Sequence, residues 1–208
     1  QVLMKVNTNK WNRIRYTVYA PIYDLIGSYF AASRKASVNS LRIESGEKVL
    51  IIGAGTGLDL EFFPPNCEIT LTDITASMLE RARKRNLKLK RNIIIHVMDG
   101  QNLDFPDGSF DKIVLHLILA VIPDPAACIR EAERVLKKGG KVSVFDKFLG
   151  KNKKASLLRR FFNLFTSLLF SDISRDFESI HSKSNLRLVS DVPADFSGHF
   201  RRILLVKN

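Results

Sequence analysis

Cysteine is scarce in this 208-residue sequence: Cys67 and Cys128 are the only two, and they lie far apart. This scarcity argues against a disulfide framework, and the spacing is not that of a structural zinc site. We therefore expect a reducing, cytoplasmic setting. The first residues lack a signal-peptide pattern, and Gln1 points to an N-terminus that was trimmed or processed.

Long apolar runs are also missing. A membrane-spanning helix needs about 18 consecutive apolar residues. The segment Ile113–Ile122 is too short, and Arg159 and Arg160 interrupt Leu157–Phe170. The sequence thus predicts a protein that can lie on a membrane but does not cross one.

Acidic residues are outnumbered: 21 Asp and Glu face 33 Lys and Arg, which gives a formal net charge of +12. Such an excess attracts polyanions, meaning nucleic acid, anionic lipid or acidic substrates, and does not choose between them. The hydrophobic fraction of 45% is that of an ordinary globular protein, and the length suits one domain.

Apolar runs and helical segments alternate through the middle of the chain, which implies parallel βαβ units in a three-layer arrangement. A helix is also expected before the first strand. A short helical stretch that ends at Phe63 is expected after that strand. The strands are expected at Lys48–Ile52, Glu68–Thr72, Asn92–Met98, Asp111–Leu117 and Lys141–Phe148, and the helices at Tyr23–Leu41, Thr75–Lys88 and Pro125–Leu136.

The C-terminal part has two β-rich runs, Leu186–Val192 and Phe200–Val206, with no room for a crossover helix between them. They are expected to pair as an antiparallel hairpin at one sheet edge. The predicted fold is α/β, a single doubly wound, Rossmann-like sheet that is mostly parallel, with helices on both faces. Residues 1–44 are expected to form a helical cap over the site and 45–208 the core, with 151–182 as an amphipathic membrane or lid insertion.

A glycine-rich loop, Gly53-Ala54-Gly55-Thr56-Gly57, follows the first predicted strand. Glycine tolerates positive φ and lets a ligand approach the backbone closely, while the next helix presents free N–H groups. The dinucleotide fingerprint requires a glycine where this chain has Leu58, which disfavours a nicotinamide cofactor.

Two acidic residues end neighbouring predicted strands, Asp73 after the second and Asp99 after the third. Open α/β sheets bind ligands in the crevice at the carboxyl ends of their strands, and a carboxylate there can accept both ribose hydroxyls. A helix-capping role is the alternative for Asp73. Together the two acids indicate a nucleotide-like ligand.

These motifs resemble those of the class I S-adenosylmethionine-dependent methyltransferases. The glycine loop, Leu71–Thr75 with Met78, Met98–Pro106, Ser109–Asp111 and Arg134–Lys141 carry the likeness, although Lys138 stands where proline is commoner. The resemblance implies S-adenosylmethionine as the methyl donor, with Gly53 and Gly55 at its methionine part, Asp73 at the ribose, Asp99 at the adenine amine, and His116 and Leu117 beside the sulfonium. The cofactor-binding residues expected on this basis are Tyr23, Gly53, Ala54, Gly55, Thr56, Gly57, Asp73, Ile74, Met78, Asp99, Gly100, Gln101, His116 and Leu117.

The stretch Arg15–Asp24 resembles the entry segment of two groups, the bacterial phosphatidylethanolamine N-methyltransferases and the quinone-ring C-methyltransferases. The resemblance implies that Tyr16 and Tyr19 contact substrate and that Tyr23 borders the cofactor. Aromatic faces attract cations, although simple packing against the sheet is an equal alternative for these tyrosines.

Later segments are more similar to the phospholipid group, namely Val121–Pro125, Phe145–Phe148, Asp172–Phe177 and Gly198–Arg201. The resemblance implies N-methylation of a membrane phospholipid headgroup, with C-methylation of a quinone precursor ring as the alternative. A nucleic-acid methyltransferase is disfavoured, because the chain has no Asn-Pro-Pro-Tyr-type motif and no RNA-binding module.

The segment Lys151–Phe170 places its leucines and phenylalanines on one broad helical face and Lys153, Arg159 and Arg160 on the other. This pattern is typical of a helix at a membrane interface, and equally of a helix that packs over the site. We expect a monomer peripherally associated with the inner face of the cell membrane.

Amine methylation needs a neutral nitrogen, so a proton must leave first, and Tyr19, His116 or a water is expected to accept it. In-line transfer from a sulfonium depends mainly on alignment, so no metal is expected. The candidates for a lipid phosphate are Lys147, Arg175, His199 and Arg201.

Overall fold

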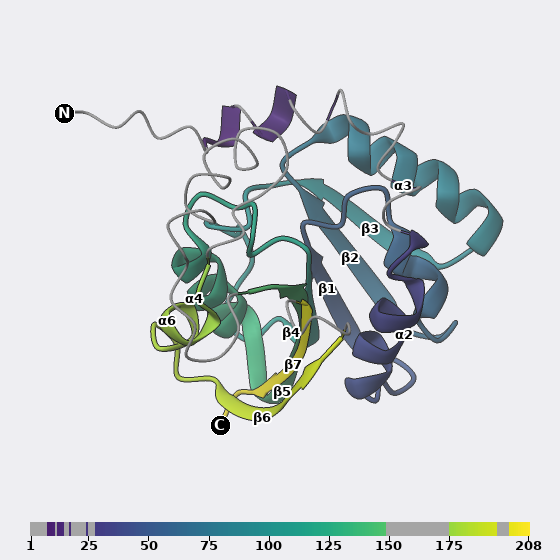
Figure 1. The fold of residues 1–208 in the computed structure, drawn as a ribbon. Helices are drawn as coiled ribbons and strands as arrows, with labels where there is room; N and C mark the ends of the chain where they lie inside the picture. The colour runs from purple at the N-terminus through teal and green to yellow at the C-terminus, as the bar shows by residue number, and fades with distance from the viewer. Residues whose placement is uncertain are drawn as a thin grey trace.

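The computed structural model describes residues 8–10, 12–14, 17, 24, 28–148, 175–194 and 200–208. Its centre is one seven-stranded sheet of order β3-β2-β1-β4-β5-β7-β6, drawn in Figure 1. Strand β7 is antiparallel to both β5 and β6, and the remaining neighbours are parallel. The strands are β1 (Lys48–Ile52), β2 (Glu68–Asp73), β3 (Asn92–Val97), β4 (Phe110–His116), β5 (Leu136–Lys147), β6 (Arg187–Pro193) and β7 (Phe200–Val206).

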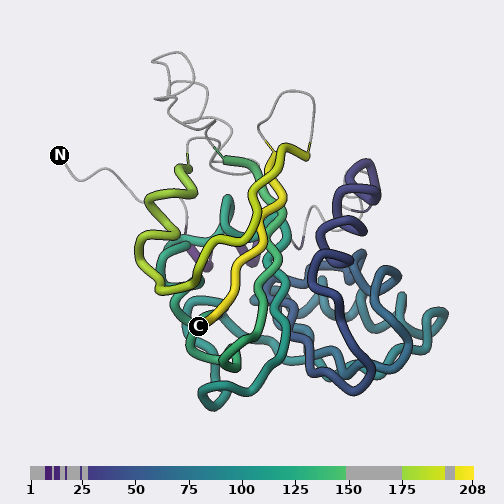
Figure 2. The backbone as a smooth tube through the Cα atoms, turned by 90° about the horizontal axis from the view of Figure 1, so that it is seen from below, coloured from purple at the N-terminus to yellow at the C-terminus, as the bar shows by residue number. Residues whose placement is uncertain are grey.

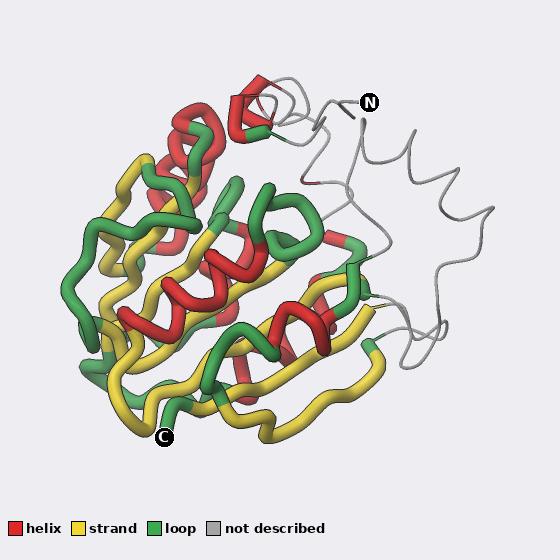
Figure 3. The backbone as a smooth tube through the Cα atoms, turned by 90° about the vertical axis from the view of Figure 1, so that its left-hand side faces the viewer, coloured by secondary structure: helices red, strands yellow, loops and turns green. Residues whose placement is uncertain are grey.

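Helices cover both faces of the sheet, as Figures 1 and 3 show. On one face lie α2 (Ala31–Ser40), the 3-10 helix η1 (Leu58–Phe62) and α3 (Ala76–Leu89). On the other lie α4 (Pro125–Val135) and α6 (Phe177–His181). The predicted doubly wound α/β fold is therefore confirmed.

Strand alternation divides the core between the two faces. In β1, Val49 and Ile51 pack toward α2 and α3, whereas Leu50 and Ile52 pack toward α4. Successive side chains of a strand point to opposite faces, so a strand covered on both sides is apolar throughout. This explains why the central strands appear in the sequence as unbroken apolar runs.

The two C-terminal strands lie beside β5 at one end of the sheet (Figure 2). Seven residue pairs, from Lys141 with Val206 to Lys147 with Phe200, join β5 to β7. The predicted antiparallel hairpin at the sheet edge is confirmed.

Strand β5 begins five residues earlier than the predicted Lys141, at Leu136. Leu136 pairs with Phe110, and an irregularity in the ladder then accommodates Gly139, whose φ is +73°. Lys207 fixes this irregular part, because its N–H donates to the Gly140 carbonyl and its carbonyl accepts from the Gly139 N–H. The glycines therefore form a bulge within the strand.

The predicted helix Tyr23–Leu41 is interrupted in the structure, where a turn at Tyr29 and Phe30 separates the helical residue Ser28 from α2. The ring of Phe30 packs against Phe145, with centroids 5.7 Å apart, and against Phe200 at 4.5 Å. Tertiary packing of this ring on β5 and β7 overrides the local helical pattern.

The predicted amphipathic helix at 151–170 lies outside the described residues. Among the residues that the structure describes, no helix is long and apolar enough to cross a membrane.

Candidate cofactor site

A cavity opens at the carboxyl ends of β1, β2, β3 and β4, at the position where open α/β sheets bind ligands. The N-terminal segment of the chain contributes Asn9 and Asn12 to its wall. The wall also contains the glycine loop, the ends of β2 and β3, and the turn that follows β4. Its lining residues are Asn9, Asn12, Ile52, Gly53, Gly55, Asp73, Ile74, Met78, Met98, Asp99, Gly100, Leu117, Ile118, Val121, Ile122 and Pro123.

The backbone of the glycine loop requires glycine. Gly53 has a φ of +71°, and a Cβ at this position would lie 2.7 Å from the Cδ1 of Ile118. L-residues rarely adopt such a φ, and a contact that short would force Ile118 away. Gly53 thus keeps the β1 exit and the turn after β4 close together.

Asp73 faces the loop from the end of β2. Its Oδ2 accepts the Gly55 N–H at 2.9 Å and its Oδ1 accepts the Thr75 N–H at 2.8 Å. Burial raises the pKa of this carboxyl, and the backbone donors act in the opposite direction. Each carboxylate oxygen has a second lone pair, so Asp73 is held in place and can still accept a ligand hydroxyl.

Asp99 lies at the end of β3 in a dense set of amide donors. Gln101 donates its backbone N–H at 3.0 Å and its side-chain amide at 2.8 Å to Oδ1. Asn9 donates its side-chain amide to Oδ2 at 2.6 Å. Gln101 is itself fixed, because its Oε1 accepts the Asp124 N–H at 2.7 Å.

Asn9 and Asn12 were not predicted from the sequence. The Asn12 amide donates to the Val121 carbonyl at 3.1 Å, and only 5% of this residue is exposed. A spacing of three places both asparagines on the same side of a helix. The i, i+3 spacing of the two amides is the one signal that the sequence offers for them.

Thr56 does not line the cavity, although it belongs to the predicted cofactor set. Its hydroxyl donates to the Asp24 carboxylate, and its carbonyl accepts the Arg85 Nε–H at 3.0 Å. Arg85 also pairs with Asp24, at 2.6 Å. These contacts fasten the N-terminal part of the chain to the outer side of the glycine loop.

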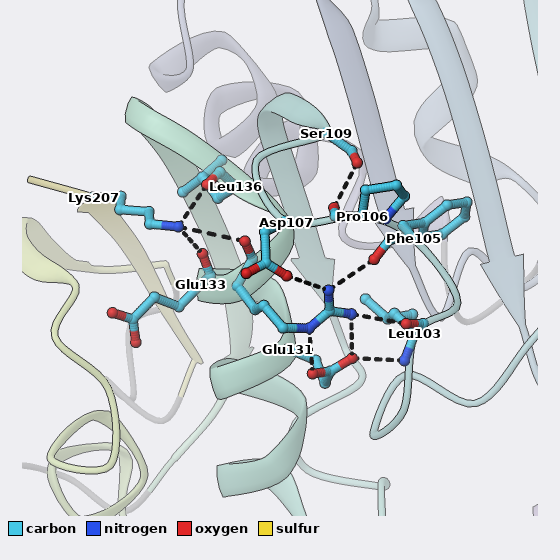
Figure 4. Close-up of polar contacts among 10 residues, drawn as sticks. Leu103, Phe105, Pro106, Asp107, Ser109, Glu131, Glu133, Leu136 and Lys207 are labelled. Atoms are coloured by element: carbon cyan, nitrogen blue, oxygen red, sulfur yellow. Dashed lines mark hydrogen bonds and ion pairs between the residues drawn. The ribbon is translucent and has the colours of Figure 1, made fainter.

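The loop from β3 to β4 contains no helix, and Arg134 of α4 stabilises it (Figure 4). Its guanidinium donates to the carbonyls of Leu103 at 2.8 Å and Phe105 at 2.7 Å, and to Asp107 at 2.8 Å. Glu131 completes the cluster by accepting from Arg134 and from the Leu103 N–H. This cluster fixes the chain that continues from Asp99 and Gly100.

His116 requires a correction. Its side chain shares the α2 face of β4 with Val114, because strand residues two apart point the same way. It contacts Asp59 and Ser37 in a site that is 4% exposed, and it is absent from the cavity wall. The predicted place of His116 beside the sulfonium, and its role as proton acceptor there, do not fit this geometry.

Arg201 requires a second correction. It pairs with Asp191 at 2.5 Å and with Glu178 at 2.7 Å, and 5% of its side chain is exposed. Both carboxylates raise the pKa of the guanidinium above its usual range, against the opposing effect of burial. Two internal carboxylates thus take the place predicted for a lipid phosphate.

The structure brings eight of the fourteen predicted cofactor residues to the cavity wall: Gly53, Gly55, Asp73, Ile74, Met78, Asp99, Gly100 and Leu117. Four others do not line the cavity, namely Ala54, Thr56, Gly57 and His116. Gln101 does not line it either, but it donates a hydrogen bond to Asp99, which does. Lys147 and Arg175 are among the described residues, and neither lines the cavity. Tyr16, Tyr19, Tyr23 and His199 lie outside the described residues.

The charges of the cavity fit a cationic nucleoside. Asp73 and Asp99 lie on its wall, and no lysine or arginine is among its described lining residues. S-adenosylmethionine carries a sulfonium, an ammonium and one carboxylate, so its net charge is positive and an acidic wall attracts it. Apolar side chains such as Met78 and Ile118 supply the remainder of the surface.

The comparisons with known proteins agree with this geometry. Residues 50–144, which run from β1 to β5, match the family model described as a methyltransferase domain. This chain is an S-adenosylmethionine-dependent methyltransferase.

Relatives of this methyltransferase act on different acceptors. It is 28% identical to a phosphatidylethanolamine N-methyltransferase of Cereibacter sphaeroides over 182 residues, 86% of this chain and 89% of the relative. It is 35% identical to a demethylmenaquinone methyltransferase of Corynebacterium kroppenstedtii, over 58% of this chain and 50% of the relative. In fold it resembles a phosphoethanolamine N-methyltransferase of Haemonchus contortus in complex with S-adenosylmethionine, with a TM-score of 0.69, 17% identity, and coverage of 85% and 52% of the two chains.

Proposed function

We propose that this methyltransferase transfers methyl groups to the headgroup nitrogen of phosphatidylethanolamine and its partly methylated forms. The observation that carries the proposal is the extent of the similarity. The phosphatidylethanolamine enzyme matches along 86% of this chain and along 89% of its own length. The quinone enzyme cited above matches 58%.

S-adenosylmethionine, when bound, supplies an electrophilic methyl group. The contribution of the protein is alignment, which can lower a barrier by about 7–11 kcal/mol in well-oriented reactions. In the proposed site Asp73 holds the ribose hydroxyls and Asp99 the adenine amine. The apolar turn from Leu117 to Pro123 excludes water from the reacting end.

The acceptor nitrogen must lose its proton before attack. With His116 buried against Asp59, the proposed proton acceptors are Tyr19 or a water. Tyr16 and Tyr19 remain the proposed contacts of the headgroup cation. Lys147, Arg175 and His199 remain the proposed contacts of the lipid phosphate, without Arg201.

The proposed working surface is the inner face of the cell membrane, on which the enzyme lies peripherally. Lys10 and Arg13 are exposed and do not line the cavity. Arg81, Lys84 and Lys88 form an exposed stripe on α3. Each such charge near an anionic lipid surface contributes about 1 kcal/mol. Residues 1–44 as a cap and 151–182 as a lid or membrane segment belong to the same proposal.

The test is incubation with labelled S-adenosylmethionine and vesicles that contain phosphatidylethanolamine together with an anionic phospholipid. We expect label in the mono-, di- or trimethylated ethanolamine lipids, and less label as salt screens the vesicle charge. The matched control replaces phosphatidylethanolamine with phosphatidylcholine, which has no methyl-accepting nitrogen. Absence of labelled ethanolamine lipid under every vesicle composition would reject the proposal.

The alternative acceptor is a quinone precursor ring, favoured by the 35% identity to the demethylmenaquinone enzyme. Incubation with total cell lipid distinguishes the two acceptors. A quinone-ring acceptor predicts label in the quinone fraction, and the amount of label should not depend on phosphatidylethanolamine.

A further inference from the structure

A chain of buried polar side chains lies behind the cofactor cavity, between α2 and the sheet. Arg34 donates to both carboxylate oxygens of Asp59 at 2.9 Å. The Oδ1 of Asp59 also lies 2.9 Å from the Nδ1 of His116, and the Nε2 of His116 lies 3.0 Å from the Ser37 hydroxyl. Ser37 in turn lies 2.6 Å from the Ser143 hydroxyl.

All five residues are at most 4% exposed. Although burial acts to raise it, Arg34 and His116 hold the pKa of Asp59 far below its usual range, so Asp59 is an anion. A buried pair of this kind is weak evidence for stability, because desolvation offsets much of the attraction. Stability alone is therefore a poor explanation for the cluster.

The position of the cluster suggests another role. Asp59 lies in η1, which begins directly after the glycine loop. The N–H of Leu60 in this helix donates a hydrogen bond to the carbonyl of Gly57. His116 ends β4 and is followed by Leu117, a cavity-lining residue with a φ of +57°. The Asp59–His116 contact thus joins η1, which follows the glycine loop, to the end of β4, which leads into the cavity-lining turn at Leu117.

A catalytic reading of the order Ser37, His116 and Asp59 can be set aside. The order resembles that of a serine nucleophile with its base and orienting carboxylate. Ser37 is only 2% exposed, lies between His116 and Ser143, and does not line the cofactor cavity. A substrate carbonyl has no approach to it.

We propose that His116 is a positioning residue: its contact with Asp59 sets the separation between the glycine loop and the turn after β4, and thereby the affinity for S-adenosylmethionine. The contact with Ser37 has a different effect, since it only fastens α2 to the sheet. This inference rests on the proposed cofactor site and is independent of the phospholipid acceptor.

The two contacts of the imidazole, Nδ1 with Asp59 and Nε2 with Ser37, can be removed separately by substitution. In His116→Asn the side-chain amide keeps a donor near the place of Nδ1, toward Asp59, and loses the reach to Ser37. His116→Gln keeps the reach toward Ser37 and loses the donor at the Nδ1 position. Ser37→Ala removes the Ser37 contact and leaves the Asp59 contact unchanged. Titration with S-adenosylhomocysteine gives the affinity, and thermal unfolding gives the stability.

We expect His116→Gln to weaken the affinity about tenfold, the effect of one hydrogen bond to a charged group. His116→Asn and Ser37→Ala are expected to keep the affinity of the wild type while lowering the melting temperature. Equal affinity in all three variants would overturn the inference and leave a purely structural cluster. Absence of binding by the wild type would overturn the proposed cofactor site itself, so the two failures are distinguishable.

Discussion

The side-chain amide of Asn9 donates a hydrogen bond of 2.6 Å to the Oδ2 of Asp99, a residue 90 positions later in the chain. The second amide of the cluster, Gln101, also reaches both carboxylate oxygens, at 2.8 and 3.1 Å. The carboxylate that we propose for the adenine amine is thus already well supplied with donors. A ligand amine at this position has to share Oδ2 with Asn9 or displace it.

The Asn9→Ala variant is therefore expected to bind S-adenosylhomocysteine more tightly. One neutral donor that competes for an acceptor accounts for about 1 kcal/mol, which corresponds to roughly fivefold in affinity. Calorimetric titration measures the change. Asn102→Ala, an exposed neighbour of Gln101, is the control and should match the wild type. Weaker binding by Asn9→Ala would contradict this competition and show that Asn9 itself contributes a favourable contact to the ligand.

Replacement of Arg201 tests whether this residue is structural. Arg201→Ala leaves Asp191, itself 6% exposed, as a buried carboxylate without its guanidinium. Breaking a buried pair in this way costs about 3–5 kcal/mol of the free energy of unfolding. Arg187→Ala, at an exposed position of β6, is expected to stay within about 0.5 kcal/mol of the wild type. Urea unfolding gives both values; unchanged stability with a raised KM for lipid would restore the phosphate role.

Asp146 predicts a dependence of stability on pH. It accepts the N–H groups of Ala120 and Lys147, and burial raises its pKa to about 6. In an unfolded chain an aspartate titrates near pH 3.9. Between these values the folded state holds the extra proton, so the contribution of Asp146 to stability falls as the pH rises through this window.

The Asp146→Asn variant lacks that titration. From pH 4 to pH 7 the free energy of unfolding of the wild type should fall relative to the variant by up to about 3 kcal/mol. Urea unfolding at several pH values measures the difference. Asp104→Asn, at an exposed position, provides the comparison and should show no such trend. A constant difference between wild type and Asp146→Asn across the range would contradict the raised pKa.

The sheet could be predicted from the sequence because each central strand is buried on both faces and appears as an apolar run. Leu50 and Ile113 illustrate this, since both are fully buried between layers of helices. The glycine loop and the two acids were equally predictable, because each follows directly from a strand end. The early start of β5 was not, because it depends on Lys207, which is adjacent only after folding.

Side-chain direction marks the limit of sequence reasoning in the site. His116 and Leu117 are adjacent in the chain, yet Leu117 lines the cavity and His116 points toward α2. Which face a strand presents to a ligand depends on the helix that covers the other face. The same reason hides Asn9 and Asn12, whose partners Asp99 and Val121 are about a hundred residues away.

The most direct test of the account is the affinity of Asp73→Asn for S-adenosylhomocysteine, measured by calorimetric titration. The substitution keeps the size of the side chain and removes the charge that accepts the ribose hydroxyls. Two hydrogen bonds to a charged group account for roughly 3 kcal/mol, so we expect affinity to fall about a hundredfold. Asp104→Asn should bind as the wild type does. Equal affinity of Asp73→Asn and the wild type would contradict the placement of the cofactor in this cavity.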